Sequence, residues 1–125
     1  MDIYNIAATD ETPAVNLNPE TGVLEMEGKS LPEDVTQFYT PILQWLDAYA
    51  GFPAPHTNMI FTMTYFNTAS SKLILDVLMK LEEIKEEGKD VKVTWKYQED
   101  DEDMEEAGEE YSEIVDVPFD MISYE

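Results

Sequence analysis

The sequence predicts an α/β (α+β mixed) fold in which one mixed β-sheet carries its helices on a single face, while the other face stays largely open to water. The hydrophobic pattern alternates along the chain between the two-residue period of strands and the period of three and four residues typical of helices. Three predicted strands are also polar on one face, whereas a sheet covered on both faces has continuously apolar strands. The polar residues are Glu25 and Glu27, Thr62 and Thr64, and Lys92 and Lys96. The two lysines can lie opposite the two glutamates on the open face, although the sequence leaves the strand order undecided.

The first part of the chain predicts a strand, a turn, a second strand and then a helix. Asn, Pro, Thr and Gly in residues 18–22 supply the turn, and the strand after it alternates in polarity. A stripe at helical spacing follows, and Ser30 with Glu33 fits a capping box before it. Pro41 falls inside this helix, so we expect a kink there or a restart capped by Thr40. The stripe consists of Val35, Phe38, Ile42, Leu46 and Tyr49.

The second part of the chain predicts strand, helix, strand, helix and a final strand. Residues 57–67 form a strand with Phe61, Met63 and Tyr65 on one face, and residues 68–87 form the clearest helix, ended by Gly88. Residues 90–98 alternate as a strand. A weaker, acidic helix begins near Asp101 or Asp103, and the last segment is an edge strand because Pro118 would interrupt a central one.

The amino-acid composition limits the functions that the chain can have. The 125 residues are expected to form a single domain, 1–125, with 43% hydrophobic residues, a net charge of −21 and no cysteine. Such negative charge disfavours nucleic acid and anionic membranes as partners. No signal peptide or membrane span is evident, so a cytoplasmic location is predicted.

No catalytic constellation or cofactor site is predicted. The only histidine, His56, lies in a proline-rich loop and is interpreted as loop packing. Trp45 and Trp95 are interpreted as core residues. The acidic run in residues 99–113 lacks the glycine that a calcium loop requires, so no metal ion is predicted.

The junction NTASSK (residues 67–72) crowds one amide and three hydroxyl side chains onto a predicted helix start. Plain capping explains such residues, because each can accept a hydrogen bond from a free backbone N–H. The same N–H groups also stabilise an anion. A phosphate on Thr68 would find these donors in place, with Lys72 one helical turn away.

Residues 65–97, YFNTASSKLILDVLMKLEEIKEEGKDVKVTWKY, resemble the SiaC family of bacterial regulatory phosphoproteins, as do the acidic helix and VPF after them and residues 12–49 before them. The resemblance implies a STAS-like fold and a partner switch. In such a switch, a histidine-kinase-like serine/threonine kinase phosphorylates the threonine that matches Thr68, and a phosphatase 2C-type enzyme removes the phosphate. The unphosphorylated form engages an output protein, a diguanylate cyclase in the namesake system.

The phosphoacceptor of the family carries over to Thr68 alone. Asn67, Ser70, Ser71 and Lys72 match or flank the motif and are assigned a supporting role. Ala69 stands where the family pattern suggests serine, and Ser70 is an alternative acceptor. The chain is therefore interpreted as a non-enzymatic regulator without a cofactor. The alternative is a constitutive module that binds a basic protein through its acidic third helix, without phosphorylation.

Overall fold

The computed structural model describes residues 1–125 and contains six strands and three helices. In chain order these are β1 (Tyr4–Ile6), β2 (Ala14–Leu17), β3 (Val23–Ser30), α1 (Val35–Tyr49), β4 (His56–Phe66), α2 (Thr68–Glu86), β5 (Asp90–Gln98), α3 (Glu102–Ile114) and β6 (Phe119–Tyr124).

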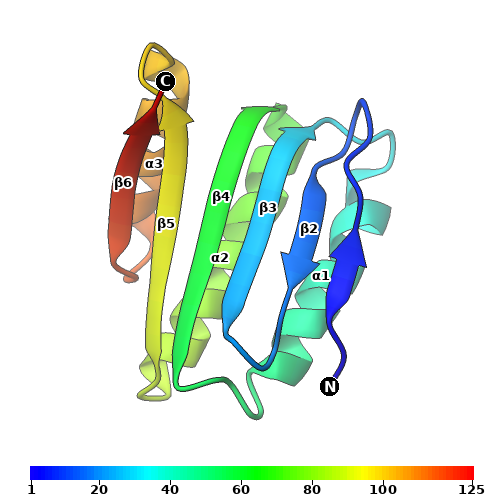
Figure 1. The fold of residues 1–125 in the computed structure, drawn as a ribbon, viewed down its shortest axis with the longest axis vertical. Coiled ribbons are helices and arrows are strands. Elements are labelled where there is room, and N and C mark those ends of the chain that lie inside the picture. The colour runs from blue at the N-terminus through cyan, green and yellow to red at the C-terminus, as the bar shows by residue number, and fades with distance from the viewer.

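The six strands form one sheet in the order β1-β2-β3-β4-β5-β6. The first three strands pair antiparallel, whereas β3 to β6 pair parallel. Parallel neighbours need a crossover, and each of the three helices supplies one. All three helices lie behind the sheet in Figure 1, so the mixed sheet with helices on one face is confirmed. The final strand is an edge strand, as predicted.

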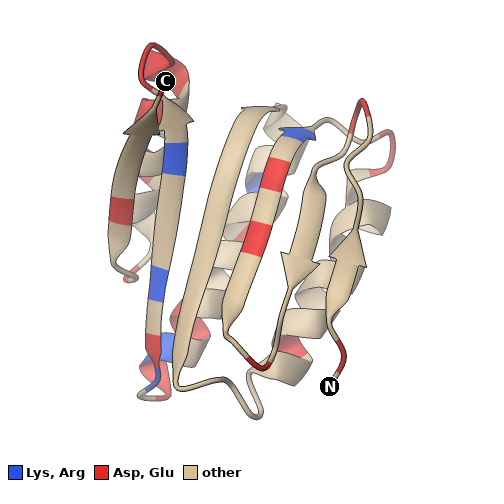
Figure 2. Ribbon diagram, in the orientation of Figure 1, with Lys and Arg blue, Asp and Glu red and all other residues tan.

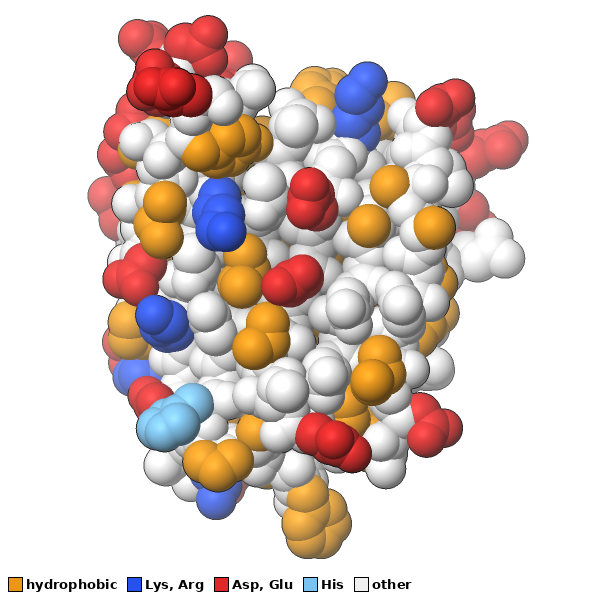
Figure 3. Space-filling model, viewed as in Figure 1, with side chains coloured by type: hydrophobic (Ala, Val, Ile, Leu, Met, Phe, Trp, Pro, Cys, Tyr) orange, Lys and Arg blue, Asp and Glu red, His pale blue; other side chains and the backbone are white.

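The core lies between the helices and the inner face of the sheet. It holds 25 buried hydrophobic residues, of which Trp95, Tyr39 and Tyr49 are the largest fully buried aromatic side chains together with Phe61. Along β3 and β4, buried side chains of the inner face alternate with more exposed side chains of the open face, most of which are polar or charged. Apolar side chains on the open face occur as separate spots (Figure 3).

The charges on the open face are arranged differently from the sequence expectation. Strand β4 lies between β3 and β5, so Glu25 aligns with Ile60 and not with a lysine. Lys92 instead pairs with Asp120 of β6, with Nζ 3.1 Å from Oδ2. Figure 2 shows the acidic positions of β3 and the basic positions of β5 separated by an uncharged strand.

Helix α1 differs from the sequence prediction in its N-cap and in the absence of a restart at Pro41. Asp34 is its N-cap, because the Asp34 carboxylate accepts a hydrogen bond from the Gln37 N–H at 3.1 Å. Ser30 is not a cap but the buried last residue of β3. The helix continues through Pro41 without a restart, and the Thr40 hydroxyl donates to the Thr36 carbonyl instead of capping.

A β-bulge in the pairing of β3 with β4 reverses the expected side of Tyr65. The register shifts by one residue between Gly28 and Lys29, so Thr64 has no partner in β3. Beyond it, Tyr65 points outward and is 52% exposed, whereas Phe66 packs against the core. A bulge changes which face a side chain occupies, since faces alternate with every residue.

The remaining elements agree closely with the sequence. Helix α2 begins at Thr68, and α3 begins at Glu102 with Asp101 as its N-cap. The short strand β1 was not predicted. None of the helices combines the length and hydrophobicity that a membrane crossing needs.

Candidate functional site

The candidate site is the first turn of α2, where β4 ends. Asn67 is extended and caps the helix, its side-chain oxygen accepting a hydrogen bond from the Ser70 N–H at 2.8 Å. Its carbonyl accepts the Ser71 N–H at 3.0 Å. Thr68 is the first helical residue and its side chain is exposed. The Asn67 side chain therefore caps the helix without help from a hydroxyl group.

Ser70 belongs to a buried hydroxyl network that joins three elements. The Ser30 hydroxyl at the end of β3 donates to the Ser70 hydroxyl, which donates to the Ser30 carbonyl, both at 2.9 Å. The Tyr39 hydroxyl of α1 lies 2.6 Å from the Ser30 hydroxyl. Burial raises the pKa of Tyr39 to about 12, against the smaller opposing effect of these hydrogen bonds. All three side chains are fully buried.

Ser71 and Lys72 face α3. The Ser71 hydroxyl donates back to the Thr68 carbonyl at 2.7 Å, and the Ser71 carbonyl accepts the Tyr111 hydroxyl of α3 at 2.8 Å. Burial is the main cause that raises the pKa of Tyr111 above its ordinary value. Lys72 is exposed and takes no part in the ion pairs of the structure.

The structure therefore separates the residues that the sequence placed together. Asn67 caps the helix, Ser70 is buried in the core and Ser71 bonds to its own helix, whereas Thr68 is exposed and its hydroxyl makes no hydrogen bond within the chain. The burial of Ser70 argues against its role as an alternative acceptor, because a phosphate there would have to displace the network.

Sequence reasoning missed Ser30, Tyr39 and Tyr111 as supports of this turn. Ser30 was interpreted as part of a capping box, and Tyr39 lies one residue beside the apolar stripe proposed for α1. Tyr39 and Tyr111 would have been found only as core tyrosines that need a partner for their hydroxyls. The partner of Tyr39 lies nine residues before it, in β3, and the partner of Tyr111 lies forty residues before it, in α2.

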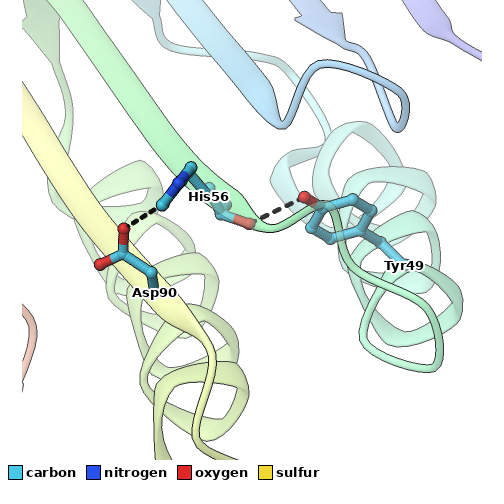
Figure 4. A network of polar contacts seen from close by, with 4 residues as sticks. Tyr49, His56 and Asp90 are labelled. Carbon is cyan, nitrogen blue, oxygen red and sulfur yellow. Dashed lines mark hydrogen bonds and ion pairs between the residues drawn. The ribbon is translucent and has the colours of Figure 1, made fainter.

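A second polar cluster lies at the opposite end of β4 (Figure 4). His56 Nδ1 contacts the Asp90 carboxylate across the starts of β4 and β5, and both side chains are exposed. Next to it, the Tyr49 hydroxyl lies 2.7 Å from the Thr57 hydroxyl and accepts the Ala54 N–H at 3.1 Å. These contacts fasten α1 to the start of β4. The chain has no group of three or more His, Cys, Asp or Glu side chains arranged to hold a metal ion.

Comparison with known proteins covers nearly the whole chain. Residues 6–124 match the family model described as SiaC family regulatory phosphoprotein. An uncharacterised protein of Pseudomonas aeruginosa strain UCBPP-PA14 is 29% identical over 119 residues, which are 95% of this chain and 94% of that protein.

Solved structures agree. A chain in the crystal structure of the diguanylate cyclase SiaD in complex with its activator SiaC, from Pseudomonas aeruginosa, is 28% identical with a TM-score of 0.91, over 97% of this chain and 99% of that chain. Apo-SiaC from the same organism is 27% identical with a TM-score of 0.88, over 98% and 100% of the two chains. A protein of Shewanella loihica with a SpoIIAA-like fold has 17% identity and a TM-score of 0.53, over 95% and 92%. The last likeness concerns the fold alone, and it supports the STAS-like sheet.

Proposed function

The chain belongs to the SiaC family of regulatory phosphoproteins, and on that premise we propose that it is a non-enzymatic regulator switched by reversible phosphorylation of Thr68. A histidine-kinase-like serine/threonine kinase adds the phosphate and a phosphatase 2C-type enzyme removes it. The unphosphorylated form binds an output protein in the cytoplasm.

The observation that carries the proposal is the exposed Thr68 hydroxyl among hydroxyls that are already engaged. Thr68 is the first residue of a helix that runs to Glu86, so its backbone N–H and that of Ala69 have no partner within the helix. The helix N-terminus favours negative charge, and Lys72 lies one turn further along. Asn67 caps this turn, and Ser70 anchors it to β3.

The proposed output protein is a diguanylate cyclase. This rests on the crystal structure of the diguanylate cyclase SiaD in complex with its activator SiaC, in which one chain is 28% identical to this chain. With a net charge of −21, a further −1.5 to −2 charges hardly change the overall field, so the phosphate must act inside a contact surface. A local cost of about 3 kcal/mol weakens a complex about a hundredfold, which suffices for switching.

Phosphopeptide mass spectrometry on the protein from its native host tests the proposal. Phosphate is expected on Thr68 of the wild-type protein, and Thr68→Ala should lose it. Ser71→Ala, three residues further along the same turn, is the matched control and should keep the phosphate on Thr68. An unmodified peptide under all growth conditions, and after incubation with cell extract and ATP, would sink the proposal.

The second candidate is the constitutive acidic binding module, and the distribution of charge favours keeping it. No basic residue follows Lys96, and α3 has Glu or Asp at seven positions: Glu102, Asp103, Glu105, Glu106, Glu109, Glu110 and Glu113. A complex driven by these charges weakens steeply with ionic strength. The Thr68 switch responds mainly to phosphate, so a salt titration separates the two candidates.

A further inference from the structure

Two adjoining hollows lie beside the first turns of α2, along the side of α3 that faces it. One, of about 210 Å³, lies between α2 and α3, and the other, of about 420 Å³, lies between the end of β4 and the start of α3. Phe66 and Ala107 line both. We call the pair the Phe66 groove, formed chiefly by Tyr65, Phe66, Leu75, Ala107, Tyr111 and Ile114.

The Phe66 groove has an aromatic floor and an apolar mouth. The rings of Phe66 and Tyr111 lie 6.3 Å apart, centre to centre, and Phe66 also packs edge-on against Trp95 at 6.4 Å. At the mouth, Ile114 is 61% exposed and Tyr65 is 52% exposed. Exposed apolar side chains gathered around a concave surface mark an interaction site rather than ordinary surface.

The rim of the Phe66 groove is acidic. Asp101, Asp103 and Glu110 line the hollows, against Lys72 as the one basic residue among the lining groups. Figure 2 marks further acidic positions around the start of α3, and Figure 3 shows acidic side chains gathered at the upper left corner of the molecule. Apolar floor and negative rim together select an occupant with an apolar side chain and neighbouring positive charges.

We infer that the Phe66 groove is a docking site for a segment of a partner protein that inserts a leucine, isoleucine or aromatic anchor flanked by lysine or arginine. A second copy of this chain fits poorly, since it would bring two acidic α3 helices together. Anionic lipid is repelled for the same reason. The inference is separate from the proposed switch, because the groove has its shape and charge without phosphate on Thr68.

The probe is a library of random linear peptides displayed on phage and selected on the full unphosphorylated chain. Selected peptides should share an apolar anchor next to lysine or arginine. Two variants test the groove directly: Ile114→Thr removes one of the two apolar side chains at the mouth, and Glu110→Lys reverses one charge of the rim. Each should weaken binding of the selected peptides about tenfold or more, because the first removes apolar contact area and the second sets a lysine against the positive charges of the peptide.

Two matched controls exclude effects that any substitution would have. Ile122→Thr changes another exposed isoleucine, on β6, and Glu109→Lys makes the same charge change one residue away on α3, outside the groove. Both should bind the selected peptides within about twofold of the wild type. Thr68→Ala should do the same, so a failure of the phosphorylation proposal would leave the groove inference standing. Failure to enrich any peptide, selection of peptides without basic residues, or equal binding by the groove variants and their controls would overturn the inference. Peptide-induced shifts in the amide spectrum confined to the open face of the sheet would overturn it as well.

Discussion

At the start of α2, polar residues that are adjacent in sequence have different environments. Asn67 accepts a backbone N–H, Ser70 is fully buried between β3 and α1, and Ser71 bonds to its own helix. Hydrogen bonds within a protein contribute modestly when made, but a buried group left without a partner costs more. Ser70 and Ser71 should therefore differ in their effect on stability although they are chemically identical.

Ser70→Ala should lower the free energy of unfolding by about 1–3 kcal/mol, because the Ser30 hydroxyl loses its acceptor inside the core. Ser71→Ala should change it by less than about 0.5 kcal/mol, since the lost bond is local and alanine favours the helix. Urea denaturation of both variants measures the difference. Equal stabilities of the two variants would contradict the assigned network.

Gly108 is required by a close approach of α3 to the sheet. A Cβ at this position would lie 2.5 Å from Trp95 Cδ1 and 2.8 Å from Met121 Cε. Trp95 cannot yield easily, because its indole N–H donates to the Met104 carbonyl at 3.0 Å. The position is therefore fixed by packing and not by backbone conformation.

Gly108→Ala should destabilise the protein by about 1–2 kcal/mol, the cost of overpacking reduced by the better helix propensity of alanine. Gly51→Ala is the control, since its added Cβ would lie 3.4 Å from the nearest atom outside its chain neighbours, the Ala48 carbonyl oxygen. Thermal unfolding followed by circular dichroism compares them. A Gly108→Ala protein as stable as the control would show that α3 can move away from Trp95 at little cost.

Among the elements, α2 is held at its first turn by both other helices. Tyr39 of α1 reaches it through Ser30, and Tyr111 of α3 bonds to the Ser71 carbonyl. Both tyrosines have a raised pKa because of burial. The protonated hydroxyls of Tyr39 and Tyr111 thus help to join the three helices.

Alkaline pH should loosen this arrangement. In the unfolded chain tyrosines ionise near pH 10, whereas Tyr39 in the folded protein ionises at about 12, so the unfolded state loses its protons first and rising pH favours it. Between these values the free energy of unfolding should fall by about 1.4 kcal/mol per pH unit because of Tyr39, and the raised pKa of Tyr111 acts in the same direction. Circular dichroism with tyrosinate absorbance follows the transition. Tyr111→Phe should make the fall shallower, and a pH profile identical to that of the wild type would refute the explanation.

For the whole molecule, the excess of carboxylates causes electrostatic repulsion between negative charges in the folded state. The net charge is −21 and only five ion pairs form, one of them with His56. Compact states concentrate like charges, so the repulsion destabilises folding unless salt screens it.

Sodium chloride should therefore raise the midpoint of urea unfolding. A variant with Glu106, Glu109 and Glu113 changed to glutamine, all exposed on α3, should start from a higher midpoint and gain less from salt. A midpoint that falls with salt in the wild type would show that the ion pairs outweigh the repulsion. Chloride at moderate concentration is preferable to sulfate, which strengthens apolar burial by itself.

The sequence was informative where a signal is local. The start of α2 follows from Asn67 and the apolar stripe behind it, and the layered architecture follows from strands with one polar face. Features that depend on distant pairing were not visible. The outward turn of Tyr65 requires a bulge opposite Gly28, and the burial of Ser30 requires Tyr39 and Ser70 to meet it.

The candidate site was also predictable from the sequence only in part. Thr68 stands out from sequence because of its neighbours and the family resemblance, but its exposure relative to Ser70 is a tertiary property. The Phe66 groove combines residues from β4, α2 and α3, and no short sequence motif indicates it. Strand β1, with three residues, was too short to show any period.

The helix-free face of the sheet offers a handle for experiments that must leave the rest of the surface untouched. Asn16 is exposed on this face in β2, and the chain contains no cysteine. An Asn16→Cys variant would therefore carry one addressable thiol, distant along the sheet from β5 and β6. Tethered to a sensor chip or a fluorophore through that thiol, the protein would present both Thr68 and the Phe66 groove to incoming partners in a single, uniform orientation.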